Sequence, residues 1–193
     1  ITTVMYARPL WPASPCEKPP HSQRYNGICK GRIYTRPHLV AIRGLWKSEG
    51  RKVVFTNGCY DVLHPGHIRL LEQARSLGDI LVLGLNTDSS VSRMKGPTRP
   101  INNEQDRAEL AAHLAAVDAV TLFDEDTPRE LIAELLPDVL IKGADWSHFI
   151  AGREEVEAAG GVVLTVPLEP GLSTTNIVKE LLARQPAGAS RPA

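Results

Sequence analysis

Apolar and polar positions follow two recurring patterns from about residue 31 onward. Short apolar runs of strand length lie at 52–56, 79–85, 117–123, 139–142 and 162–166. Segments with helical apolar spacing lie at about 39–50, 66–77, 102–114, 131–136, 153–159 and 174–183. Because short buried strands that alternate with helices form parallel sheets, the pattern predicts an α/β protein. The expected architecture is a Rossmann-like, doubly wound parallel sheet with helices on both faces.

Three of the helices have residues typical of helix starts. The 102–114 helix begins with an asparagine cap and has acidic residues in its first turn. Thr127 to Glu130 reads as a capping box with Pro128 at the first helical position. Ser173 is predicted to open the last helix.

The two ends of the chain lack both patterns. Five prolines fall within the first twenty residues, and proline removes a backbone donor and fixes φ. We therefore expect residues 1–30 to be a disordered basic tail. A targeting segment is the alternative, but the apolar stretch of a secretory signal and the amphipathic spacing of a mitochondrial one are missing. Residues 186–193 read as a frayed C-terminal tail, which leaves 31–185 as the predicted domain.

Charge and composition narrow the classes of function. Lys plus Arg and Asp plus Glu both number 22, but residues 1–50 carry a net +6 and residues 51–193 a net −6. An acidic domain argues against a nucleic-acid binder. No apolar run approaches the roughly 20 residues of a membrane-spanning helix, and the three cysteines give no disulfide framework. We expect a cytoplasmic protein with neither nucleic-acid nor membrane partners.

The most informative residues follow the first predicted strand. Doubly wound folds bind ligands beyond the carboxyl ends of their strands, and here that position holds TNGCYDVLHPGH, residues 56–67. Gly58 allows a tight turn, while His64 and His67 flank the start of a helix whose free N–H groups favour anions. Two imidazoles there can donate hydrogen bonds to phosphate oxygens. Lys142 ends the fourth strand at the same edge, where an isolated lysine seldom lies without an anionic partner.

Other ligand classes fit this segment less well. The spacing of the two histidines permits zinc, but no cysteine or acidic residue lies nearby at a matching spacing for a third ligand. We therefore expect no metal ligand from protein side chains. Neither a P-loop motif nor a G-x-G-x-x-G run occurs in the chain.

The H-x-G-H signature after such a strand resembles the nucleotidyltransferase superfamily that includes cytidylyltransferases and pantetheine-phosphate adenylyltransferases. The resemblance extends to the D-glycero-β-D-manno-heptose 1-phosphate adenylyltransferases. It rests on the motifs VVFTNGCYDVLHPGHIRLLEQARSLGD, RMKGPTRPINNEQDRA, FDEDTP, PDVLIKGADW and GLSTTNIV, between residues 31 and 182. That enzyme is often fused behind a sugar kinase. Residues 1–30 are too few to hold one, so a stand-alone transferase is expected.

The resemblance implies a role for individual residues. His64 and His67 would stabilise charge at the α-phosphate, and Lys95, in the loop after the second strand, would reach a phosphate. The implied nucleotide-binding residues are Thr56, Asn57, Gly58, Cys59, Gly66, Lys142, Ser173, Thr174 and Thr175. The implied sugar-phosphate-binding residues are Asp61, Arg99 and Asp145.

The implied reaction joins AMP from ATP to heptose 1-phosphate and releases pyrophosphate. Mg²⁺ would arrive with the ATP phosphates, and the ADP-heptose formed would be a precursor of the lipopolysaccharide core, of another surface glycan or of a secondary metabolite. The attacking phosphate is already an anion, so catalysis needs positioning and charge stabilisation, with no covalent nucleophile. Cys59 is accordingly interpreted as a small loop residue. Dimers are common in the superfamily, so a homodimer is expected by analogy.

Two departures from the family pattern bear on the substrate. Trp146 in GADW is more typical of glycerol-phosphate cytidylyltransferases. Those enzymes, however, place an arginine before the final serine–threonine motif, where this chain has Leu168-Glu169-Pro170-Gly171. A glycerol-3-phosphate or ethanolamine-phosphate cytidylyltransferase using CTP is therefore the alternative enzyme. A regulatory module that binds nucleotide without turnover would be expected to have a damaged H-x-G-H motif, and here the motif is intact.

Overall fold

The computed structural model describes residues 32–144, 149–167 and 173–184. The strands are β1 (Val53–Gly58), β2 (Ile80–Asn86), β3 (Ala119–Phe123), β4 (Val139–Gly143) and β5 (Val162–Val166). The helices are α1 (Arg36–Ser48), α2 (Pro65–Arg75), α3 (Asp88–Lys95), α4 (Glu104–Ala112), α5 (Arg129–Leu135), α6 (Arg153–Ala158) and α7 (Thr174–Ala183). The two predicted tails, 1–30 and 186–193, lie outside the described residues.

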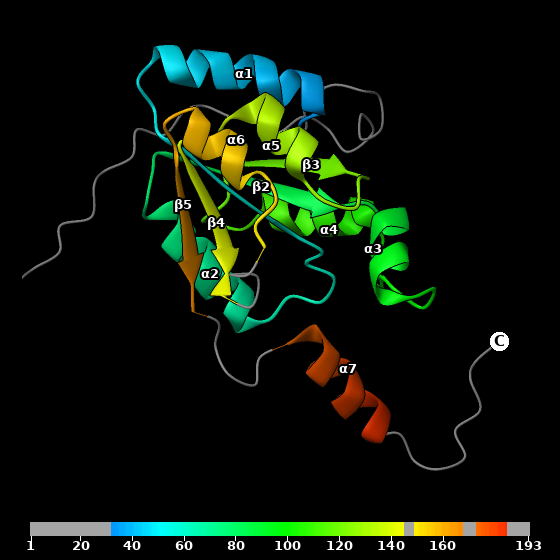
Figure 1. Cartoon of the computed structure of the whole chain (residues 1–193). Coiled ribbons are helices and arrows are strands. Elements are labelled where there is room, and N and C mark those ends of the chain that lie inside the picture. Colours follow the sequence, from blue (N-terminus) through cyan, green and yellow to red (C-terminus); the bar gives the residue numbers. More distant parts are fainter. Residues whose placement is uncertain (1–31, 145–148, 168–172, 185–193) are drawn as a thin grey trace, which may run out of the picture. The chain divides into compact units, whose positions relative to one another are not determined.

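The five strands form one parallel sheet in the order β3-β2-β1-β4-β5 (Figure 1). The chain builds the sheet outward from β1 to β3, then crosses back and continues from β4 to β5 on the other side of β1. Strand order therefore reverses between β1 and β4. In open α/β sheets this is where ligands bind, next to the carboxyl ends of the strands.

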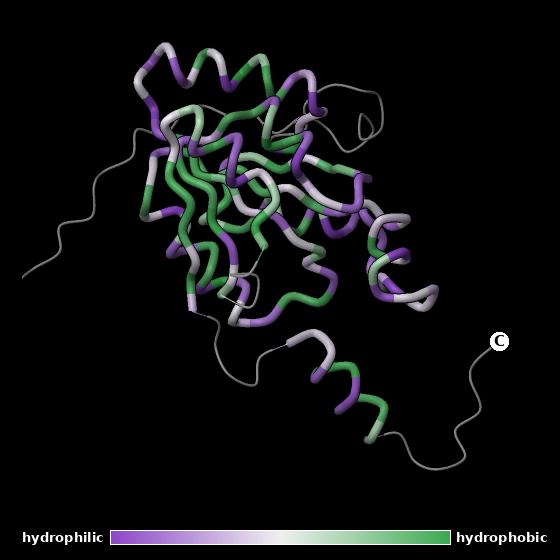
Figure 2. Tube along the Cα trace, viewed as in Figure 1, coloured by the Kyte–Doolittle hydropathy of each residue, from purple (hydrophilic) through white to green (hydrophobic). Residues whose placement is uncertain are grey.

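Helices cover both faces of the sheet, as the sequence pattern predicts. Successive side chains of β1 point to opposite faces: Val54 packs in a cluster with α2 and α4, whereas Val53 and Phe55 pack in a cluster with α1, α5 and α6. Figure 2 shows the strands as predominantly hydrophobic segments. The predicted Rossmann-like, doubly wound fold is confirmed.

One helix was not predicted from the sequence. The segment Asp88–Lys95 forms α3, although only Ser90 and Val91 of its residues are buried. Its sequence, DSSVSRMK, has too few apolar positions to show helical spacing. Thr87 caps the helix by accepting a hydrogen bond from the Ser90 backbone N–H. The placement of Lys95 in a loop is therefore wrong, because Lys95 is the last residue of a helix.

Two predicted helix caps form and one does not. Asn103 accepts a hydrogen bond from the Asp106 N–H, and Ser173 accepts one from the Asn176 N–H. The capping box at Thr127 is wrong, because Pro128 occupies the N-cap position and makes no side-chain cap hydrogen bond. Within the described residues, no helix is both long and apolar enough to span a bilayer.

Candidate active site

Two stacked histidines lie where β1 leads into α2. His64 is the N-cap residue of α2, and the His67 N–H donates to the His64 carbonyl at 2.9 Å. The ring centroids of His64 and His67 are 3.7 Å apart, with an angle of 22° between the ring planes. Pro65 is the first residue of the helix. Proline suits this position because the backbone N–H that it lacks would have no helical partner there. The structure thus brings both predicted catalytic histidines together at a helix N-terminus.

Both imidazoles are neutral near pH 7. The pKa of His67 is lowered from 6.5 to about 4, mainly by burial and to a smaller extent by the nearby charges of His64 and Lys95. Burial also lowers the pKa of His64. The Nδ1 atoms of both rings are buried and have no hydrogen-bond partner among the described residues. A neutral imidazole has one N–H donor and one acceptor nitrogen.

Tyr60 packs against the histidine pair. The sequence pattern did not predict this role. The Tyr60 φ of +46° lies in the left-handed region. Its ring folds back over Gly58, where an added Cβ would lie 3.0 Å from the Tyr60 ring. The same ring lies 4.7 Å from that of His67, centroid to centroid. The Tyr60 hydroxyl hydrogen-bonds Thr56, and burial raises the pKa of this hydroxyl.

Asp61 holds the loop between α3 and α4. Its carboxylate accepts hydrogen bonds from Arg99 Nε at 2.7 Å and from the backbone N–H groups of Ile101 and Asn102 at 2.8 and 2.9 Å. The Asp61 side chain is only 1% exposed. Asp61 is therefore a buried anchor for the loop that carries Arg99.

The remaining predicted residues lie on several elements of the same edge. Lys142 is half-buried near the end of β4, beside Thr165 of β5. The Thr174 hydroxyl donates to the Val62 carbonyl at 3.1 Å, which ties the start of α7 to the loop before His64. Thr175 is exposed in the first turn of α7. Asp145 and Trp146 lie outside the described residues.

Residues 56–59, at the end of β1 and just after it, differ in how far their side chains are exposed. Thr56 is buried, whereas Asn57 and Cys59 are partly exposed. The Asn57 side-chain oxygen is buried and has no hydrogen-bond partner in the described part of the chain. Cys59 Sγ lies 3.9 Å from the Asn86 side-chain oxygen. No group of three or more His, Cys, Asp or Glu side chains suited to a metal ion occurs within the described ranges.

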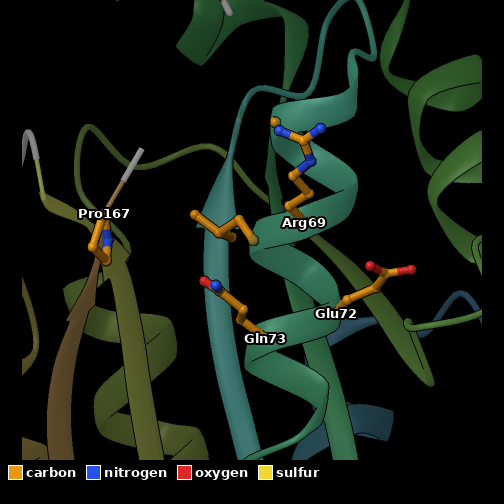
Figure 3. A pocket seen from close by; sticks show the side chains of 6 residues that line it. Arg69, Glu72, Gln73 and Pro167 are labelled. Carbon is orange, nitrogen blue, oxygen red and sulfur yellow. The ribbon is translucent and has the colours of Figure 1, made fainter. Parts of the chain in front are cut away.

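A pocket of about 190 Å³ opens beside the H-x-G-H helix. It is lined by Gly66, Arg69, Leu70, Glu72, Gln73 and Pro167. Figure 3 shows Arg69, Glu72 and Gln73 on α2, with Pro167 across from them at the end of β5. The pocket therefore lies between α2 and the segment just after β5.

Known proteins are similar to this chain in sequence. Two bifunctional proteins HldE are 58% identical over 134 residues (Hyphomonas neptunium) and 57% identical over 141 residues (Magnetococcus marinus). These alignments cover 69% and 72% of this chain, but only 28% and 29% of the relatives. The chain thus spans less than a third of the length of these two curated relatives.

Solved structures also match this chain in fold. A lipopolysaccharide core biosynthesis protein from Thermoplasma volcanium is 31% identical with a TM-score of 0.52, over 62% of this chain and 98% of that protein. A pantoate–beta-alanine ligase from Francisella tularensis is 16% identical with a TM-score of 0.54, over 81% and 80%, and shows the fold alone. The cytidylyltransferase-like family matches residues 55–180. With the H-x-G-H histidines at the expected edge of the sheet, this chain belongs to the cytidylyltransferase-like family and is a nucleotidyltransferase.

Proposed function

We propose that this chain transfers AMP from MgATP to D-glycero-β-D-manno-heptose 1-phosphate, giving ADP-heptose and pyrophosphate. The observation that carries the proposal is the stacked pair of neutral histidines at the start of α2. The heptose acceptor is supported by the motifs TNGCYD and KGPTRPI, by the similarity to the HldE proteins, and by the similarity to a lipopolysaccharide core biosynthesis protein.

The chemistry is a direct in-line displacement. A phosphate oxygen of the sugar phosphate attacks the α-phosphorus of ATP, a new P–O bond forms, and the bond to the pyrophosphate oxygen breaks with its electron pair. The attacking oxygen is already anionic near neutral pH, so no general base is required. The protein must instead orient two polyanions and stabilise the charge that develops between them.

His64 and His67 would supply hydrogen-bond donors at the α-phosphate. Because both rings are neutral in the free protein, each carries one N–H, and the positive end of the α2 dipole adds to the same field. Lys95 lies close enough to His67 to depress its pKa, so we propose that it serves the same phosphates. Mg²⁺ bound to ATP would offset part of the remaining negative charge.

Other residues would hold the substrates. We propose that Asn57, Cys59 and Lys142 contact the nucleotide, and that the α7 start, with Ser173 and Thr174, contributes hydroxyl and backbone donors. We propose that Arg99, held by Asp61, faces the sugar phosphate. A cytoplasmic setting and a homodimeric assembly remain predictions.

A cytidylyltransferase is the second candidate. Trp146 favours it, whereas the absence of arginine from residues 168–171 disfavours it. The two candidates differ in both donor and acceptor, so the product separates them.

The test is to identify the product by mass. The full chain is incubated with MgATP and heptose 1-phosphate, and we expect a product that carries one AMP unit on the sugar phosphate. Free heptose is the matched control and is expected to give nothing, because it lacks the attacking phosphate. An adenylylated product from free heptose, or the absence of adenylylated heptose 1-phosphate, would contradict the proposal.

A further inference from the structure

Arg107 is a fully buried arginine that links three segments at the active edge of the sheet. It lies on α4, and its side chain is 0% exposed. Its guanidinium donates to the Cys59 carbonyl at 2.7 Å, to the Asp88 carboxylate at 2.7 Å and to the Asn102 carbonyl at 3.0 Å. Because it is out of reach of solvent, Arg107 acts through the groups that it holds.

The contact with Cys59 bears on the strained residue that follows. Tyr60 has a φ of +46°, and a bulky residue in the left-handed region costs about 1–3 kcal/mol. Such a conformation persists only where its surroundings fix it. A charged donor 2.7 Å from the Cys59 carbonyl fixes the peptide group that enters Tyr60.

The Tyr60 backbone in turn determines where its ring lies. In this conformation the ring packs over Gly58, its hydroxyl reaches Thr56, and its centroid lies 4.7 Å from that of the His67 ring. An extended backbone at Tyr60 would carry the ring elsewhere. A continuous series of contacts thus runs from Arg107 through Cys59 and Tyr60 to His67.

We propose that Arg107 is a positioning residue that holds the His67 imidazole in place by fixing the Cys59 carbonyl and the left-handed backbone of Tyr60. Its effect on turnover rests on the proposed function, whereas its effect on the His67 environment does not. In this reaction His67 must direct one N–H at the α-phosphate. A misplacement of about 1 Å at such a group can cost on the order of 100-fold in rate.

The first test compares Arg107→Lys with Arg43→Lys. Lysine keeps the charge near Asp88 but lacks the planar fork that reaches several acceptors at once. Arg43 is the matched control: it is also buried, it contacts Asp138 at 3.1 Å and the Leu136 carbonyl at 3.0 Å, and Asp138 precedes β4 at the other end of the sheet. We expect kcat to fall by roughly 10- to 100-fold in Arg107→Lys, with the KM for ATP changing less than about threefold. Arg43→Lys should retain the wild-type kcat.

The second test follows His67 itself by NMR titration of the ligand-free protein. The groups that face His67 are His64, Lys95 and Tyr60, and none of them is altered in Arg107→Lys. We expect the His67 pKa to rise by about one unit or more towards 6.5 in Arg107→Lys, because water reaches the ring. In Arg43→Lys the His67 pKa should be unchanged. This readout needs no substrate, so it decides the positioning role even if the proposed reaction fails.

The link through Tyr60 has its own variants. Tyr60→Phe keeps the ring and should leave the His67 pKa near its wild-type value, whereas Tyr60→Leu removes the ring and should raise it. If the contacts act in series, adding Arg107→Lys to Tyr60→Leu raises the His67 pKa no further. These variants also carry the test if Arg107→Lys fails to fold. An unchanged His67 pKa in both Arg107→Lys and Tyr60→Leu would overturn the proposal, and so would equal losses of kcat in Arg107→Lys and Arg43→Lys.

Discussion

Acidification should destabilise the ligand-free protein through His67. Burial lowers the pKa of this residue to about 4 in the folded chain, whereas the unfolded value is 6.5. Between these values the unfolded state binds a proton that the folded state does not. The stability that is present above pH 6.5 is therefore lost as the pH falls towards 4.

The size of the effect follows from the two pKa values. One pKa unit corresponds to 1.36 kcal/mol. Between pH 7.5 and pH 5.0, the two values for His67 give a loss of about 2 kcal/mol in the free energy of unfolding. That is a large share of the roughly 5–15 kcal/mol by which a typical domain is stable.

The assay is urea unfolding of the wild type and of His67→Gln at both pH values. Glutamine cannot be protonated, so the variant should lose about 2 kcal/mol less than the wild type on acidification. His64, Asp124, Glu125 and Glu155 also have lowered pKa values, but they are present in both proteins and largely cancel in the difference. Equal losses in the two proteins would refute the reasoning and would mean that His67 is not held neutral by burial.

Three further substitutions test the site. His67→Ala should lower kcat by on the order of 10²–10³ in a pyrophosphate-release assay, because one charge stabiliser is removed; near wild-type turnover would count against the phosphate role. Cys59→Ser should retain most activity in the same assay, since its thiol has no chemical step to perform, and a complete loss in a folded variant would contradict this. Asp61→Ala should cost about 3–5 kcal/mol in urea unfolding, because Arg99 and two backbone N–H groups lose their buried partner; a loss below 1 kcal/mol would show that water replaces the carboxylate.

The sequence predicted the sheet and most helices because their apolar spacing is set by the core. Val54, Leu81 and Val139 are fully or almost fully buried, and each belongs to a run that reads as a strand. Helix α3 was not predicted because only Ser90 and Val91 of its residues are buried. Its stability comes from its cap and from neighbouring segments. Lys95 was misplaced for the same reason.

Site residues could be predicted where a motif directly follows a recognisable strand. His64 and His67 could be placed because H-x-G-H follows a recognisable strand and opens a helix. The anchoring roles of Asp61 and Arg107 could not be predicted, because Asp61 binds Arg99 38 residues away and Arg107 binds Cys59 48 residues away. In sequence a buried arginine reads as a surface charge, and only the fold shows what it holds. The left-handed backbone of Tyr60 likewise has no signal in a motif that lacks glycine at that position.

We propose that this edge of the sheet joins AMP from ATP to a heptose phosphate. The most direct test of this proposal is pyrophosphate release with Mg²⁺, in which ATP and CTP are each crossed with heptose 1-phosphate and glycerol 3-phosphate. We predict turnover for the pair of ATP and heptose 1-phosphate alone. Turnover with CTP and glycerol 3-phosphate instead would contradict the account and assign the chain to the cytidylyltransferases.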